Sequence, residues 1–261
     1  MVRKTVITIL MTTFFGFFSV SAIAGEQAME DSWDFSLAPL YVWMVDMEGT
    51  MGVGPFDTGL NVDFGTLFDN LEAIFTVHFE AIHNSNIGIF ADYNFVDVSA
   101  SGPGPQGLTT INIDFDSTIA ELGVLYRFKN GPHALDALGG FRFTKLEPAI
   151  TRTPIPPALI PPAAQRSLTE EWTDPIIGAR YSYDFGNNWI LALRADIGGF
   201  GVGSDFTWNA FGFVQWKPWK YAGIIAGYRA LDQDYEDGSG ANRFAYDMRL
   251  AGPLLALNFV W

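Results

Sequence analysis

The feature that most constrains this chain is an alternation of apolar and polar residues with a period of two. It is clearest in WILALRADI, residues 189–197, where Arg194 and Asp196 both fall on the polar side. A strand places these two charges on one face, whereas a helix would scatter them around its axis. About ten stretches of this kind follow one another along the chain. The alternation therefore predicts an all-β protein.

The connections between these stretches alternate in length. Four are short turns and five are long connectors. The turns are 83–86, 129–134, 184–188 and 217–220, and the connectors are 46–72, 99–109, 148–170, 199–206 and 233–243. Outer-membrane barrels have short periplasmic turns and long extracellular loops. We therefore predict an antiparallel transmembrane β-barrel of ten strands with both termini in the periplasm. Counts of eight or twelve are the alternatives.

The two terminal strands illustrate the expected facing of side chains. The first strand covers about 33–45 and should place its large apolar residues on a single face. The last strand covers about 246–261. The residues expected on that face of the first strand are Trp33, Phe35, Leu37, Tyr41 and Trp43.

The composition favours a barrel in a membrane over a soluble β-sandwich. Hydrophobic residues make up 49% of the chain and aromatic residues 15%, while charged residues make up only 17%, against about a quarter in soluble domains. No cysteine is present, so no disulfide stabilises the fold. A sandwich would leave an apolar face on every strand without a second sheet to bury it. The net charge of −14 argues against nucleic acid as a partner, because phosphates would be repelled.

The N-terminus predicts export. Arg3 and Lys4 precede an apolar stretch, and Ala22-Ile23-Ala24 fits an A-x-A cleavage site. We expect a signal peptide over 1–24, with an uncleaved anchor as the alternative, and one outer-membrane barrel domain over 25–261. Loss of Arg3 and Lys4 changes the net charge from −14 to −16. After residue 24 no stretch of about 18 apolar residues predicts a membrane helix.

Aromatic residues cluster where the predicted strands meet the periplasmic turns, as in an interfacial girdle. They are Tyr126, Tyr181, Tyr183, Trp189, Trp216, Trp219 and Tyr221.

The final segment, PLLALNFVW, resembles the signal that outer-membrane barrels present to their assembly machinery, with Trp261 as its last residue. Together with WDFSLAPLYVW, DPIIGARYSY, RADIGGFGVGSDFTW and AGYRALDQDYE, it resembles a largely uncharacterised family of small proteobacterial outer-membrane barrels. The resemblance implies the fold, a location in the outer membrane, and lipid and the assembly machinery as partners. It implies no particular activity.

The glycine-rich segment GGFGVGS, residues 198–204, raises the question of a phosphate-binding loop. It leads into a predicted strand, so it lacks the helix N-terminus that would hold phosphate. Glycine adopts positive φ at no cost, and we therefore interpret the segment as an extracellular turn between antiparallel strands.

Strand parity directs a set of charged side chains into the lumen. Opposite charges in a narrow barrel should pair, because an unpaired desolvated charge is costly. The predicted luminal charges are Glu80, Asp92, Glu121, Asp136, Asp174 and Asp196 with Arg127, Arg142, Arg180, Arg194 and Arg229. One interpretation is a charge-filled plug and a structural or interaction role through the extracellular loops. The other is a narrow channel for small solutes or ions, with room left by small inward residues, which are Gly88, Gly123, Gly140, Gly178, Gly198 and Gly227.

An enzyme is a weaker interpretation. The chain has three histidines, of which His83 and His133 lie at predicted turns and His78 lies mid-strand beside Glu80. Catalysis by a histidine base needs a partner nucleophile, and no motif supplies one. We therefore predict no enzyme activity, no cofactor and no metal.

The loops leave three features open. The proline-rich stretch 148–170 suits either a partner or a lid, and segment 60–72 suits a short helix or a strand extension. Asp232, Asp234, Glu236 and Asp237 lie near a predicted loop tip, where solvated acidity is favoured over cation binding because the spacing is not that of an EF-hand.

Overall fold

The computed structural model describes residues 32–103, 109–154 and 164–261. The predicted signal peptide, 1–24, and its cleavage site lie outside these residues. Within the described ranges, no helix is long and apolar enough to cross a membrane.

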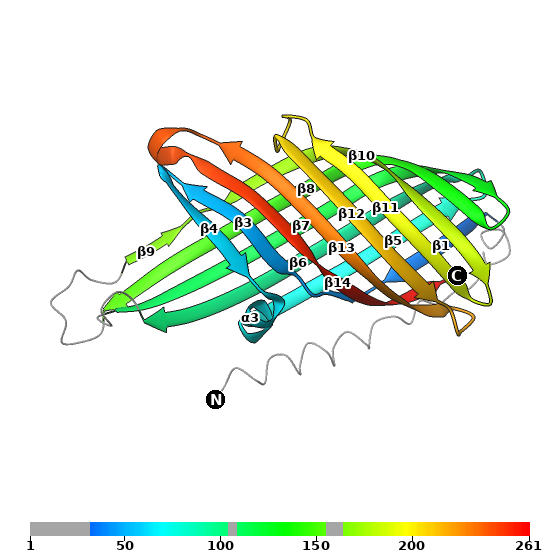
Figure 1. Cartoon of the computed structure of the whole chain (residues 1–261), viewed down its shortest axis with the longest axis horizontal. Coiled ribbons are helices and arrows are strands. Elements are labelled where there is room, and N and C mark those ends of the chain that lie inside the picture. The colour runs from blue at the N-terminus through cyan, green and yellow to red at the C-terminus, as the bar shows by residue number, and fades with distance from the viewer. Residues whose placement is uncertain (1–31, 104–108, 155–163) are drawn as a thin grey trace, which may run out of the picture. The chain divides into compact units, whose positions relative to one another are not determined.

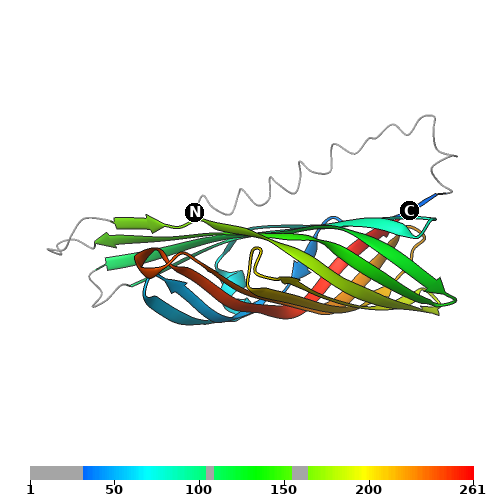
Figure 2. The ribbon, with the colours of Figure 1, turned by 90° about the horizontal axis from the view of Figure 1, so that it is seen from above.

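The chain from Asp34 onward forms a closed ring of antiparallel strands (Figures 1 and 2). The first strand of the ring is broken into β1 (Trp33–Ala38), β2 (Tyr41–Trp43) and β3 (Asp46–Val53). The other nine are β5 (Leu71–His83), β6 (Ile87–Pro103), β7 (Thr109–Asn130), β8 (His133–Pro154), β10 (Glu170–Gly186), β11 (Trp189–Gly199), β12 (Phe206–Trp216), β13 (Ala222–Asp237) and β14 (Phe244–Val260). β14 closes the ring by pairing with β1, β2 and β3. The prediction of ten strands is confirmed.

Short turns at one end of the barrel join β5 to β6, β7 to β8, β10 to β11 and β12 to β13. We call this the turn end, and the opposite end the loop end. At the loop end lie β4 (Phe56–Val62), α3 (Phe64–Asp69), β9 (Ala164–Ser167) and the 3₁₀ turn η3 (Gly240–Asn242).

The strands reach further into the loop end than the sequence predicted. β7 and β8 each have 22 residues, and they pair as far as Thr109↔Pro154. Much of the predicted connector 148–170 is therefore strand: 148–154 belongs to β8 and 164–167 forms β9, which pairs with β8. Residues 155–163 of this connector lie outside the described residues, and Glu170 already belongs to β10.

The prediction that the first strand keeps one face throughout is wrong for two residues. The chain bends at Pro39 and Leu40, which interrupt the strand, and proline cannot donate to a ladder. After the bend, Tyr41 and Trp43 face the lumen and are 3% and 8% exposed. The hydroxyl of Thr76 on β5 bonds both backbone groups of Tyr41, accepting from its N–H and donating to its C=O.

The outward faces of the strands form an apolar belt. Leu122 and Phe141 in this belt are 63% and 61% exposed. On β6 the outward apolar residues run from Ile87 to Phe95, and Asp97 is the first outward charge. Nine residues at about 3.3 Å each, with a strand tilt of about 40°, rise roughly 23 Å. This height suits the hydrocarbon layer of an outer membrane, which requires apolar side chains on its lipid face.

The predicted girdle at the turn end contains packed aromatic pairs. Trp189 and Trp216 stack with centroids 5.8 Å apart. At the seam where the ring closes, Trp261 stacks on Phe35 at 5.4 Å, and the Phe35 N–H donates to the Trp261 carbonyl at 2.9 Å. The aromatic C-terminus thus joins the last strand to the first.

Segment 60–72 resolves into the end of β4 followed by α3. The carboxylate of Asp63 caps the helix by accepting from the Thr66 N–H at 2.9 Å, and hydrogen bonds from Thr66 hold the pKa of Asp63 below its usual value. The Phe64 N–H donates to Asp46 on β3 at 2.7 Å. These bonds satisfy N–H groups that a helix start leaves without intrahelical partners.

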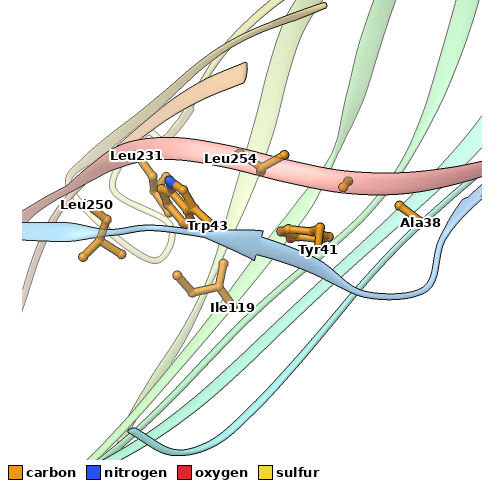
Figure 3. Close-up of a cluster of buried hydrophobic side chains, with 8 residues drawn as sticks. Ala38, Tyr41, Trp43, Ile119, Leu231, Leu250 and Leu254 are labelled. Atoms are coloured by element: carbon orange, nitrogen blue, oxygen red, sulfur yellow. The ribbon is translucent and has the colours of Figure 1, made fainter. Parts of the chain in front are cut away.

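An apolar core lies inside the barrel around β2. Figure 3 shows Trp43 gathered with Ile119, Leu231, Leu250 and Leu254, which come from three other strands. Burial of large apolar side chains stabilises a fold by about 1.5–3 kcal/mol each. This core therefore fixes the broken first strand against the strands that it faces.

Candidate functional site in the barrel lumen

Six charged side chains meet near the middle of the lumen. We call them the central cluster, and they are Asp92, Glu121, Arg142, Arg194, Asp196 and Arg229. The Arg142 guanidinium is 0% exposed and lies 2.9 Å from Glu121 and 2.6 Å from Asp196. Arg194 bonds the same two carboxylates at 2.8 and 3.0 Å. Arg229 joins Glu121 to Asp92, at 3.1 and 3.3 Å.

A second group lies closer to the turn end. We call it the turn-side cluster, and it contains Glu80, Arg127, Asp136 and Arg180. Arg180 donates to both oxygens of Glu80, at 2.6 and 2.8 Å, and to Asp136. Arg127 bonds Asp136 in a bidentate manner, at 2.7 and 2.9 Å. These are the forked pairs that the planar guanidinium favours.

Both clusters are balanced in charge. The central cluster has three arginines and three carboxylates, and the turn-side cluster has two of each. Two arginines also stack on luminal rings, with Arg194 4.9 Å from the ring centroid of Phe90 and Arg229 4.8 Å from that of Trp43. Balanced pairing matters because a buried charge without a partner costs several kcal/mol, on the order of 3–5.

Asp174 is the predicted luminal charge that joins neither cluster. Its carboxylate, 0% exposed, accepts from the Ser204 N–H at 2.6 Å and from the Trp172 indole at 3.2 Å. Ser204 ends the glycine-rich turn between β11 and β12, where Gly199 and Gly201 have φ of 85° and 71°. Asp174 therefore holds that turn over the loop end. The turn between antiparallel strands was predicted correctly.

Four uncharged polar residues complete the central cluster and were not selected from the sequence. The Tyr41 hydroxyl donates to Asp92 at 2.9 Å, and the Asn94 amide donates to the same carboxylate at 2.6 Å. Asn209 donates to Asp196 at 2.9 Å and accepts from Arg229 at 3.0 Å, and the Thr207 hydroxyl accepts from Arg142 at 3.1 Å. Inward parity on β12 was a usable signal for Thr207 and Asn209. The bend before Tyr41 hid its inward position.

The three histidines are spread over two regions. His78 lies in the lumen with its Nδ1 3.1 Å from Asp92. His83 contacts Ser85 at 2.8 Å, and His133 contacts Tyr181 at 2.7 Å, both at the turn end. The structure thus places His78 beside a carboxylate of the central cluster.

Aromatic and aliphatic side chains fill the lumen on the loop-end side of the central cluster. We call this group the aromatic cluster, and it contains Leu146, Trp172, Tyr235, Phe244, Tyr246 and Met248. The rings of Trp172 and Tyr235 stack with centroids 4.1 Å apart and an interplanar angle of 7°. Trp172 and Phe244 are 5% and 2% exposed. The cluster connects opposite parts of the wall, because its members lie on β8, β10, β13 and β14.

Glycines let neighbouring strands pack at the level of the charged clusters. Gly123 and Gly140 are directly opposite each other on β7 and β8. A Cβ on Gly140 would lie 2.3 Å from the Leu122 carbonyl oxygen, and one on Gly123 would lie 2.4 Å from the Phe90 ring. Contacts this close leave no room for a side chain at either position. These two inward glycines therefore allow β7 and β8 to pack closely and allow the Phe90 ring to lie against the wall.

A cavity of about 800 Å³ occupies the turn-end half of the lumen. We call it the vestibule. Its wall includes Ile82, Phe213 and Ile225, and its inner lining includes members of both charged clusters, such as Arg180 and Arg229. The lining contains no member of the aromatic cluster among the described residues. The lumen thus changes along its length from an open half to a filled half.

The loop end is strongly acidic. Eighteen carboxylates lie there, outside the apolar belt, against five cationic residues in the described ranges, Lys145, Arg152, Arg166, Arg243 and Arg249. The carboxylates are Asp46, Glu48, Asp57, Asp63, Asp69, Glu72, Asp97, Asp114, Asp116, Glu147, Glu170, Glu171, Asp205, Asp232, Asp234, Glu236, Asp237 and Asp247.

Partial burial together with like-charge crowding raises the pKa of two of these groups. Partial burial and the neighbouring Asp116 raise the pKa of Asp97, and partial burial with Asp247 raises that of Asp234.

The predicted loop tip at 232–237 is strand β13 instead, where Arg249 bonds Asp232 at 3.0 Å and Arg243 bonds Glu236 at 3.0 Å. No group of three or more metal-ligating side chains occurs within the described ranges.

Comparison with known proteins identifies the fold. No protein-family profile and no curated protein sequence matches the chain. Among solved structures, the outer-membrane protease OmpT from Escherichia coli matches with a TM-score of 0.60 at 9% identity, over 88% of this chain and 97% of that one.

Two further outer-membrane proteins match more loosely. They are Ail, the attachment invasion locus protein of Yersinia pestis (TM-score 0.34, 10% identity, 88% and 99% of the two chains), and a Pseudomonas aeruginosa FadL homologue (0.33, 11%, 88% and 89%). The likeness to OmpT extends over most of both chains, and the fold is that of an outer-membrane β-barrel.

Proposed function

We propose that this protein is an integral outer-membrane barrel with a closed lumen, acting as a structural or interaction protein through its loop end. The observation that carries this proposal is the balanced pairing of the central cluster around Arg142, which is 0% exposed. The Arg142 guanidinium has three luminal partners, Glu121, Thr207 and Asp196. These bonds hold it in a network that connects different strands of the barrel wall. Small barrels are commonly filled by side chains in this way.

The aromatic cluster supports the same proposal. It adds a buried, largely apolar layer between the central cluster and the loop end, so a permeating ion would meet two successive barriers. The channel interpretation predicts a hydrated passage beside the arginines, and the burial of Glu121 and Asp196, at 3% and 2% exposed, argues against it.

The orientation that we propose rests on the lengths of the connections at the two ends of the barrel. We propose that the turn end and both termini of the barrel face the periplasm and that the loop end faces outside, as in other barrels with short turns and long loops. Lipid then covers the belt, and the C-terminal strand ending in Trp261 is the segment presented to the assembly machinery. The acidic loop end becomes the surface available to external partners.

Surface labelling tests this orientation, because the chain has no cysteine. Ser101 at the loop end and Asn130 at the turn end are both exposed. We expect a membrane-impermeant maleimide to label Ser101→Cys on intact Gram-negative cells and to label Asn130→Cys only after the outer membrane is permeabilised. Labelling of Asn130→Cys alone on intact cells would reverse the orientation.

A narrow channel is the second candidate, and the vestibule is the observation that favours it. A volume of about 800 Å³ open at one end would form half of a conduction path. The path would then have to continue past Arg142 and Trp172, which requires rearrangement of both. An enzyme is not proposed, since His78, the one luminal histidine, contacts a carboxylate and no nucleophile.

A further inference from the structure

The lysines of this chain are distributed unevenly. After residue 24 the sequence has four lysines, and three of them, Lys129, Lys217 and Lys220, line the vestibule. The fourth, Lys145, lies towards the loop end and pairs with Glu147 at 2.8 Å. The chain has a net charge of −14, so three lysines around one opening form a local concentration of positive charge that stands out from the rest of the molecule.

Two of these lysines have no carboxylate within ion-pair distance among the described residues, although Asp34 and Asp184 line the same vestibule. In the part of the chain that the structure describes, the side chains of Lys129 and Lys217 make no ion pair. They come from β7 and from the residue after β12, which are separated in the ring by β8, β10 and β11. Lys220 lies over the Tyr221 ring, 4.7 Å from its centroid. The arginines deeper in the lumen, in contrast, have their carboxylate partners.

The wall between the lysines and the charged clusters is largely apolar. It includes Ile82 on β5, Ile190 on β11, Phe213 on β12 and Ile225 on β13. A cavity of about 800 Å³ falls within the range of sites that bind small molecules, roughly 300–1,000 Å³. Such sites combine apolar walls with a few polar groups that fix the orientation of the ligand.

We propose that the vestibule is a binding site for a small organic anion that enters from the turn end. The anionic group, a carboxylate or phosphate ester, pairs with Lys129 and Lys217, and an apolar body lies against Ile82, Phe213 and Ile225. The site is separate from the loop-end surface and does not depend on whether the lumen conducts. A ligand of this class would neutralise the lysines and displace water from the apolar wall.

Calorimetric titration of the refolded barrel with 4-phenylbutyrate and with 4-phenylbutan-1-ol tests the proposal, because the two probes share a body and differ in charge. We expect the carboxylate to bind at least tenfold more tightly than the alcohol at low salt, with the difference reduced at high salt by screening. Lys129→Ala with Lys217→Ala should abolish that preference. Lys145→Ala, at the other end, should leave it unchanged.

Steric occlusion supplies an independent readout. Ser182 lies in the vestibule wall, and Ser182→Trp should remove binding of both probes while the barrel stays folded. The proposal is overturned if folded wild-type protein binds neither probe. It is equally overturned if binding persists in the double lysine variant and in Ser182→Trp, since the probes would then occupy the lipid-facing surface.

Discussion

Arg142→Met is expected to lower the free energy of unfolding by about 3–5 kcal/mol, the cost of breaking a buried ion pair by removing one partner. Arg142 is 0% exposed and holds Glu121 and Asp196, with Thr207 as a third partner. Methionine approximates the length of the side chain but supplies no donor. The central cluster is then left with three carboxylates and two arginines. Urea unfolding of the barrel in lipid vesicles measures the change.

A double variant separates lost charge balance from lost packing. Glu121→Gln added to Arg142→Met restores equal numbers of arginines and carboxylates in the central cluster, so part of the lost stability should return. Lys145→Met is the matched control on the same strand, because Lys145 pairs with Glu147 at a partly exposed outward position. It should change stability little, as exposed pairs do. An equal loss in both single variants would contradict the importance of the buried cluster.

Trp172→Ala is the second substitution with a large expected effect, about 3–5 kcal/mol of lost stability, as for other buried aromatic truncations. Trp172 is 5% exposed, stacks on Tyr235 and lies 5.8 Å from the Tyr246 ring. Its removal leaves a cavity in the middle of the aromatic cluster. Its indole N–H also donates to Asp174, which holds the turn over the loop end.

An exposed aromatic residue at the same end provides the comparison. Phe56 at the start of β4 is 77% exposed, so Phe56→Ala should leave the unfolding midpoint in urea nearly unchanged. If Trp172→Ala were equally mild, the aromatic cluster would not hold the loop end together. The filled half of the lumen would then need another explanation.

Much of the fold could be predicted because the barrel imposes simple rules on its sequence. Period-two alternation and the alternation of short and long connections were enough for the strand count and for the turn at Gly199–Ser204. The same parity brought Arg142, Glu121 and Asp196 into one luminal set, since a lipid-facing strand leaves only one face for charge.

The remaining features depend on interactions that a single strand does not reveal. The bend at Pro39 turns Tyr41 and Trp43 inward without disturbing the alternation on either side. Asp174 has the same parity as the paired carboxylates, but its height in the barrel places it beside Ser204 instead of an arginine. The long extensions of β7 and β8 arise from pairing with each other beyond the belt, where composition resembles that of a loop.

The closed lumen is tested most directly by single-channel recording of the refolded mature protein in planar bilayers, with Arg142→Ala and Arg194→Ala in parallel. Folding and insertion of each sample are verified first by circular dichroism and by protease resistance in the bilayer lipid. We predict no discrete openings for wild-type protein, because the central and aromatic clusters fill the lumen in succession. Discrete wild-type openings whose conductance or ion selectivity changes in the arginine variants would contradict the closed lumen and make the channel the better description.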